Sequence, residues 1–249
     1  MTSSPRILSI AGSDSGGGAG IQADIRTITN LGGHAMTAIT AVTAQNSAGV
    51  SAVDVMTPDL VLAQIWAVMD DFGADAIKIG MLGSPEIINA VAGFLKSVGS
   101  IPIILDPVMV ATSGASLADD RTIASFAKII PNVTLVTPNL DEMERLGGVS
   151  AISGYNVPFL LKGGHDQGDI LTDRLIDSDG EQARWQAERI DTRHDHGTGC
   201  TLSAAIATYL ALGRDLQQAI SVARDYVRDS LRAAPGLGEG RGPMGVPKR

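Results

Sequence analysis

A chain of 249 residues that is 44% hydrophobic and 18% charged has the size and composition of one globular α/β domain, so we expect a single domain over residues 1–249. The formal net charge of −8, without any run of Lys or Arg, argues against binding to the phosphate backbone of nucleic acids. A single cysteine excludes an internal disulfide bond, and the apolar run at 7–11 is too short for a signal peptide or membrane span, so we expect a soluble, cytoplasmic protein.

The first 31 residues predict a strand, a loop and a helix. Residues 7–11 form a β-rich run, residues 12–20 are rich in glycine, and apolar residues recur at helical spacing over 21–31. The loop lacks the Gly-Lys-Ser/Thr of a Walker motif, and residues 35–44 contain no acidic residue to hold the ribose of a dinucleotide. The loop could close over a small substrate with Asp14 as a polar contact, or it could be a flexible turn.

The next segment predicts a strand that ends in two amides. Residues 36–42 are apolar and β-branched, and Gln45 and Asn46 follow them. Ligands of open α/β sheets collect at the carboxyl ends of strands, which makes Gln45 a candidate for ligand binding. The alternative for Gln45 is a solvent-facing turn residue. A short edge strand at 53–56 and a helix with Thr57 at its N-cap are expected next.

A regular alternation of strands and helices occupies the middle of the chain. Continuous apolar strands between amphipathic helices predict a mostly parallel sheet with helices on both faces. Two further strands surround a turn at 177–180 and should form an antiparallel hairpin. Strands are expected at 76–80, 102–105, 133–136, 158–161, 170–176 and 184–190; helices are expected at 84–95, around 123–129, from 201 and through 216–231; residues 235–249 should be irregular.

Asn139 and Glu142 stand three residues apart where a helix follows the strand at 133–136. Both side chains should point toward the edge of the sheet where ligands bind. They could hold hydrated Mg²⁺ near phosphate groups. Alternatively, they could form a capping box at the start of the helix.

The stretch 193–201 combines features of an anion-binding site. Gly197 and Gly199 flank Thr198, and a helix follows, so backbone N–H groups and the helix dipole should meet there. Cys200 lies in the first turn, a position that lowers the pKa of a thiol. The alternative is a glycine-rich loop that ends before a core helix. His194 and His196 lack the partners of a zinc site, which we do not expect.

Seven motifs, in order between residue 6 and about residue 232, resemble those of the bacterial hydroxymethylpyrimidine/phosphomethylpyrimidine kinases. They lie at residues 11–24, 43–46, 78–82, 106–114, 137–142, 162–165 and 196–205. The resemblance implies the ribokinase-like fold, with three α/β/α layers and a mostly parallel sheet. It also implies ATP-dependent phosphorylation of 4-amino-5-hydroxymethyl-2-methylpyrimidine and then of its monophosphate, with Mg²⁺, in a homodimer.

The same resemblance assigns roles to residues. The pyrimidine would be bound by Gln45 and Asp14, with Gly12, Met81 and Val108 lining its pocket. Gly197, Thr198, Gly199 and Cys200 would form the anion hole, with Cys200 where related sugar kinases carry an aspartate base. ATP phosphates would be bound by Asp106, Asn139, Lys162 and Thr198, and Mg²⁺ by Asp106 and, through water, Glu142. For Asn139 and Glu142 the resemblance favours this role over the capping box.

The sequence differs from the family pattern at two places, and two alternative functions stay open. Residues 146–157 are too short and too rich in glycine for the family's helix there, which we expect to be lost or reduced to a turn. The C-terminal segment lacks a histidine that is often found in the family. A pyridoxal-type vitamin kinase or a non-catalytic pyrimidine-binding domain remains an alternative. We also expect Gly199 to need close approach and a backbone conformation that a Cβ would obstruct.

Overall fold

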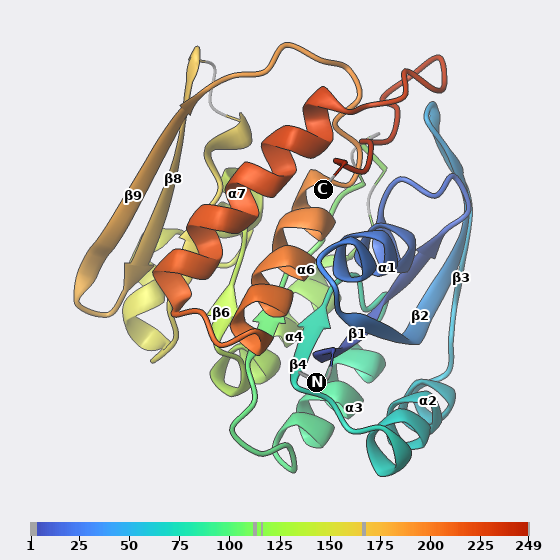
Figure 1. Ribbon diagram of the computed structural model, residues 1–249. Helices are drawn as coiled ribbons and strands as arrows, with labels where there is room; N and C mark the ends of the chain where they lie inside the picture. The colour runs from blue at the N-terminus through green and yellow to red at the C-terminus, as the bar shows by residue number, and fades with distance from the viewer. Residues whose placement is uncertain (1–3, 112–113, 116, 166–167, 249) are drawn as a thin grey trace.

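The computed structural model describes residues 4–111, 114–115, 117–165 and 168–248, and in this part the strands form one nine-stranded sheet (Figure 1). Their order across the sheet is β3-β2-β1-β4-β5-β6-β7-β8-β9. Pairing is parallel from β2 to β7, and β3, β8 and β9 are antiparallel to their neighbours. The strands are β1 (Arg6–Asp14), β2 (His34–Asn46), β3 (Gly49–Val55), β4 (Ala76–Ile79), β5 (Ile103–Leu105), β6 (Leu135–Val136), β7 (Phe159–Leu161), β8 (Ile170–Asp177) and β9 (Gly180–Glu188).

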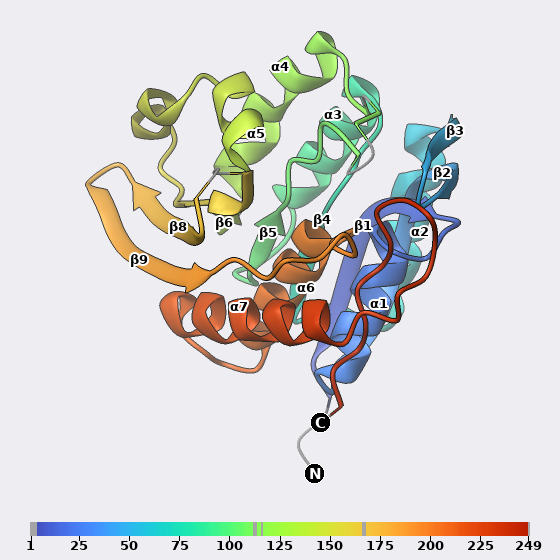
Figure 2. The same cartoon turned by 90° about the horizontal axis from the view of Figure 1, so that it is seen from above.

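Helices cover both faces of this sheet, which confirms the three-layer α/β/α prediction (Figure 2). One face carries α2 (Pro58–Asp71), α3 (Pro85–Leu95), α4 (Asp120–Ile129) and α5 (Leu140–Arg145). The other face carries α1 (Gly20–Asn30), α6 (Thr198–Ala211) and α7 (Leu216–Arg232). Short 3₁₀ turns lie at Ile130–Asn132, Val149–Gly154 and Gly163–His165.

Alternating strand residues supply the two apolar cores. In β4, Ile77 and Ile79 pack with α2, α3 and α4, whereas Ala76 packs against the layer of α1, α6 and α7. All three are fully buried. A strand that is buried on both faces is mostly apolar, and Lys78 of β4 is buried only because Asp24 pairs with it; the strands predicted as apolar runs accordingly form the centre of the sheet.

Local sequence signals are confirmed at several boundaries. The Thr57 hydroxyl accepts a hydrogen bond from Leu60 N at 3.3 Å, and the Ser84 hydroxyl accepts one from Ile87 N at 3.2 Å, so both helices begin as predicted. The predicted hairpin is β8 and β9, with an antiparallel register that closes at Asp177 and Gly180. Between Gly148 and Val157 the chain forms only the short 3₁₀ turn, so the family's α-helix is reduced there as expected.

The strand that leads into the glycine-rich loop is longer than predicted. β1 continues to Asp14 because Ser13 and Asp14 still pair with Val42 and Thr43 of β2. The loop therefore begins at the end of a buried strand and leads directly into α1. Thr112 and Ser113, part of the motif at 106–114, lie outside the described residues.

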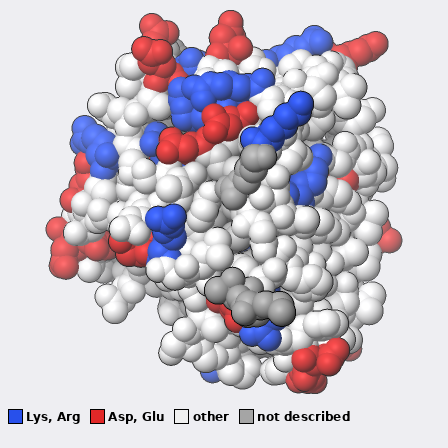
Figure 3. All heavy atoms as spheres, viewed as in Figure 1, with Lys and Arg blue, Asp and Glu red and all other residues white. Residues whose placement is uncertain are grey.

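The C-terminal segment after α7 is irregular over its described part, 235–248, as predicted. It returns to the glycine-rich end of the molecule, where His196 N donates to Gly242 O at 3.1 Å. On the face seen in Figure 3, basic and acidic side chains are interspersed and much of the surface is uncharged. Among the described residues, the structure contains no helix with the length and apolar character needed to cross a membrane.

Candidate functional site

A cavity of about 650 Å³ lies at the carboxyl ends of the parallel strands, beside the N-terminus of α6. Its lining includes every residue predicted to bind substrate, phosphate or metal, and every residue of the expected anion hole: Gly12, Asp14, Gln45, Met81, Asp106, Val108, Asn139, Glu142, Lys162, Gly197, Thr198, Gly199 and Cys200. The fold thus brings together predicted site residues that are up to 188 positions apart in the sequence, from Gly12 to Cys200.

The loop before α6 turns at Gly197. This residue has a left-handed φ of 90°, and a Cβ there would collide with the carbonyl of Gly18. α6 begins at Thr198, whose N–H donates to Asp195 O at 3.3 Å, and the N–H groups of Gly199 and Cys200 follow at the positive end of the helix dipole, beside the cavity. This is the geometry of an anion-binding helix N-terminus.

The prediction for Gly199 is right in one part and wrong in the other. Its φ is not in the left-handed region, because Gly199 lies within the first turn of α6 and it is Gly197 that makes the turn. Obstruction of a Cβ is confirmed, since it would lie 3.1 Å from Asp106 Oδ2 and 3.2 Å from Lys162 Nζ; close approach of the Gly199 N–H to a phosphoryl group stays a prediction.

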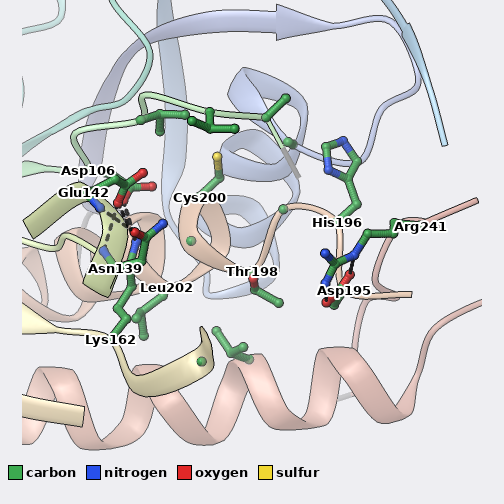
Figure 4. Close-up of a pocket in the computed structure, with 18 of the residues that line it drawn as sticks. Asp106, Asn139, Glu142, Lys162, Asp195, His196, Thr198, Cys200, Leu202 and Arg241 are labelled. Atoms are coloured by element: carbon green, nitrogen blue, oxygen red, sulfur yellow. Dashed lines mark hydrogen bonds and ion pairs between the residues drawn. The ribbon is translucent and has the colours of Figure 1, made fainter. Parts of the chain in front are cut away.

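A cluster of charged groups occupies one end of the cavity (Figure 4). Lys162 Nζ lies 2.8 Å from Asp106 Oδ1 and 3.9 Å from Glu142 Oε2. Burial lowers the pKa of Lys162, but the two carboxylates outweigh it and hold that pKa above its ordinary value. With one ammonium between two carboxylates, the cluster is arranged to attract a further cation.

Asn139 and Glu142 form a capping box at the start of α5. The preference for a phosphate and metal role over this capping box was therefore wrong. Asn139 Oδ1 accepts from Glu142 N at 2.8 Å, and Glu142 Oε2 accepts from Asn139 N at 2.8 Å. Burial raises the pKa of Glu142, and Lys162 only partly offsets that effect. The side chain therefore caps α5 and also lies in the cavity wall, because the helix starts at the edge of the sheet.

The prediction of a lowered pKa at Cys200 is wrong. Burial raises the pKa of this thiol to about 11, although Lys78 opposes the shift. The carboxylates of Asp24 and Asp106 raise it further. The position in the first turn of a helix is outweighed because desolvation and the field of the two carboxylates both favour the uncharged thiol. Cys200 is therefore a neutral thiol at pH 7.

On the opposite side of Cys200 the cavity wall carries two further pairs, Asp14 with His196 and Asp195 with Arg241, as well as apolar contacts (Figure 4). Gly12 and Met81 are in close contact there, since a Cβ on Gly12 would lie 3.2 Å from Met81 Sδ. Val108 and Gln45 also line the cavity. Asp14 is in the wall, but its carboxylate accepts hydrogen bonds from the N–H groups of residues 16, 18 and 19, so it holds the glycine-rich loop in shape. A direct contact between Asp14 and a substrate stays a prediction.

Residues 14–245 match the phosphomethylpyrimidine kinase family. The chain belongs to this family. A hydroxymethylpyrimidine/phosphomethylpyrimidine kinase of Rhizobium meliloti is 46% identical over 255 aligned residues, which cover 95% of each chain. Among solved structures, the ADP complex of Bacillus subtilis pyridoxal kinase has a TM-score of 0.88 at 31% identity and covers 98% of each chain. Phosphomethylpyrimidine kinase of Clostridium difficile has a TM-score of 0.75 at 36% identity, covering 90% of this chain and 98% of that one.

The likeness to these kinases confirms the ribokinase-like fold class. The side chains around the anion-binding turn also show whether this member of the phosphomethylpyrimidine kinase family could bind Mg²⁺. The described residues contain no group of three or more His, Cys, Asp or Glu side chains placed to hold a metal. Asp106 and Glu142 offer carboxylate oxygens beside the anion-binding turn. Mg²⁺ is commonly held by one or two carboxylates together with water and substrate phosphates, so this pair fits it.

Two groups of functional interest escaped the sequence analysis. The first is a fully buried ion pair between Lys78 of β4 and Asp24 of α1, at 2.8 Å, which also receives a hydrogen bond from Ser9. Its signals were a lysine inside an apolar strand and an aspartate on the apolar face of a helix. The second is His196, which contacts Asp14 and Gln45; the sequence suggested for it only a place in a motif and a zinc site that was not expected.

Proposed function

We propose that this chain transfers the γ-phosphoryl group of ATP to the hydroxymethyl oxygen of 4-amino-5-hydroxymethyl-2-methylpyrimidine, and then phosphorylates the resulting monophosphate. The observation that carries the proposal is one cavity whose wall joins the charged cluster of Asp106, Glu142 and Lys162, the N-terminus of α6, and the Gln45 amide with the apolar side chains of Met81 and Val108. The charged cluster and the helix N-terminus suit polyphosphate, and the amide suits the donor and acceptor edge of an aminopyrimidine.

Phosphoryl transfer depends mainly on positioning and on neutralising charge. In this proposal the N–H groups of Gly197, Gly199 and Cys200 hold the transferred phosphoryl group, since the Thr198 N–H donates to Asp195 O, and Lys162 binds the phosphates of ATP. Asp106 and Glu142, the latter through water, would hold Mg²⁺, which supplies charge neutralisation between the phosphates. Asn139 orients Glu142 through the capping box. Gln45, Met81, Val108 and Gly12 orient the pyrimidine so that its hydroxymethyl group faces the anion-binding turn.

The role of Cys200 follows from its neutral thiol. A thiol with a pKa of about 11 is about 1 in 10,000 ionised at pH 7, so it contributes little as a general base. A loose transition state needs little base assistance, because the acceptor oxygen forms its bond late. We therefore assign Cys200 a packing role at the cavity floor and a backbone N–H toward the phosphoryl group.

A pyridoxal kinase is the second candidate, favoured by the higher TM-score to the Bacillus subtilis pyridoxal kinase. Sequence identity favours the pyrimidine instead, since the Rhizobium meliloti relative that is 46% identical is a hydroxymethylpyrimidine/phosphomethylpyrimidine kinase. ADP release measured with each substrate at equal concentration decides between them. We expect a higher kcat/KM for the pyrimidine, and a second round of ADP release with its monophosphate. A higher value for pyridoxal would overturn the proposal, and no release with any of them would indicate a non-catalytic domain.

We also propose a homodimer in the cytoplasm. β3 is an edge strand of the described sheet, and β2 and β3 expose apolar side chains, with Val42 44% and Val53 42% exposed. An open edge with exposed valines favours pairing with a second copy. The single cysteine suits a reducing compartment. Sedimentation of the wild type and of Val53→Lys tests the dimer, which the substitution should weaken.

A further inference from the structure

His196 lies in the cavity wall, between the glycine-rich loop and Gln45. Its Nε2 is 2.8 Å from Asp14 Oδ2 and 3.2 Å from the Gln45 amide nitrogen. Figure 4 shows the ring on the opposite side of Cys200 from the cluster of Asp106, Glu142 and Lys162. The ring is buried, so its hydrogen bonds have to be satisfied within the protein.

The proton on this ring nitrogen can be assigned from Asp14. Burial raises the pKa of Asp14, but hydrogen bonds from His196 and from the loop N–H groups outweigh it and leave that pKa below its ordinary value. An ionised carboxylate can only accept hydrogen bonds. His196 Nε2 must therefore carry a proton and donate it toward Asp14 Oδ2, whether the ring is neutral or charged.

This assignment determines the orientation of the Gln45 amide. A protonated Nε2 cannot accept from the amide nitrogen, so two donors would face each other. A half-turn of the amide places its oxygen toward His196 and its nitrogen toward Thr43 Oγ1, which lies 3.2 Å from the present oxygen position. The Thr43 hydroxyl donates to Ser13 O at 3.0 Å and keeps lone pairs to accept from the amide. The Nε2–H then faces two acceptors, Asp14 Oδ2 and the Gln45 oxygen, and one amide N–H faces Thr43 Oγ1, which leaves the second amide N–H for the cavity.

We propose that His196 is a positioning residue that, together with Thr43, locks the Gln45 amide in this orientation and so determines which ring edge the enzyme accepts. The inference deepens the proposed function and rests on it. The locked amide offers the cavity one N–H and one oxygen in a fixed order. An aminopyrimidine presents a ring nitrogen that accepts next to an amine that donates, which matches that order. The 4-oxo analogue, with oxygen in place of the amine and a protonated ring nitrogen, presents the reverse.

The test is the ratio of kcat/KM for the 4-amino substrate to that for its 4-oxo analogue. We expect the wild type to favour the amine by about tenfold to a hundredfold, as expected when polar groups in a site are left unpaired. His196→Asn, whose amide reaches only the position of Nδ1, should lower the ratio at least fivefold. His196→Gln places an amide N–H near the position of Nε2 and should keep the wild-type ratio.

Thr43→Val supplies a second, independent variant, because it removes the acceptor for the amide nitrogen and lies away from the anion-binding turn. It should also lower the ratio. A ratio is unaffected by any general loss of activity from a disturbed loop, and the ATP KM of each variant provides a further check on the phosphate end. If His196→Asn and Thr43→Val both keep the wild-type ratio, or if the wild type does not prefer the 4-amino substrate, the proposal that His196 and Thr43 orient the Gln45 amide is refuted. A wild type that phosphorylates neither pyrimidine would instead refute the proposed function.

Discussion

Replacing Gly199 by alanine should lower kcat more than removing the thiol of Cys200 does. An added Cβ at position 199 would lie 3.1 Å from Asp106 Oδ2 and 3.2 Å from Lys162 Nζ. Ordinary contacts of a carbon atom are about 3.5–4 Å, so the paired side chains must move by a few tenths of an ångström. They are held to each other at 2.8 Å, so both ends of the pair are displaced together.

The size of the effect follows from what those side chains do in the proposed reaction. A misplacement of about 1 Å in a phosphate-positioning group can cost about 10²-fold in rate. For Gly199→Ala we therefore expect a loss of about 10- to 100-fold in kcat, and a larger loss for Gly199→Val. Cys200→Ala keeps its backbone N–H and removes a thiol that is neutral at pH 7, so its loss should stay below about tenfold.

Single-turnover phosphorylation of the pyrimidine by each variant measures the step directly. Gly93→Ala is the matched control, because Gly93 lies in α3, and a Cβ there would meet no atom within 4 Å. A general base contributes about 10²–10⁴ to a rate. If Cys200→Ala lost that much while Gly199→Ala kept most of its activity, the thiol would carry the chemistry and the reasoning from its raised pKa would be refuted.

Three further predictions concern binding and stability. Gln45→Ala should raise the KM for the pyrimidine while the KM for ATP stays within a few-fold, and an unchanged pyrimidine KM would remove Gln45 from the pocket. Because the pKa of Glu142 is raised by burial, the folded state loses stability as pH rises from about 4.5 through the folded pKa. Glu142→Gln should therefore raise the Tm at pH 8 and change it little at pH 4, and an equal change at both would contradict this. Lys78→Met should lower the free energy of unfolding by about 3–5 kcal/mol, since it leaves buried Asp24 unpaired, whereas adding Asp24→Leu should recover most of that in denaturant titrations.

The order of the layers could be read from the sequence because each signal is local. Thr57 and Ser84 cap their helices with hydrogen bonds to residues three positions ahead, and the turn at 177–180 closes a hairpin between adjacent strands. The location of the cavity was predictable for a related reason. Residues that follow parallel strands meet at one edge of the sheet, so Gln45, Asp106 and Lys162 had to lie near one another.

The properties of individual side chains depended on neighbours that lie far away in the chain. The residues paired with Lys78 and His196 stand 54 and 182 positions away, and nothing local identifies either partner. For Cys200 the local signal, a helix N-terminus, predicted a shift in the wrong direction. Desolvation and the field of distant carboxylates exceed the effect of the helix end, and both come into being only when the layers pack. The sequence thus determined the elements, their order and the residues of the cavity, whereas the tertiary structure decided their protonation and orientation, because burial and through-space charge are properties of the packed chain.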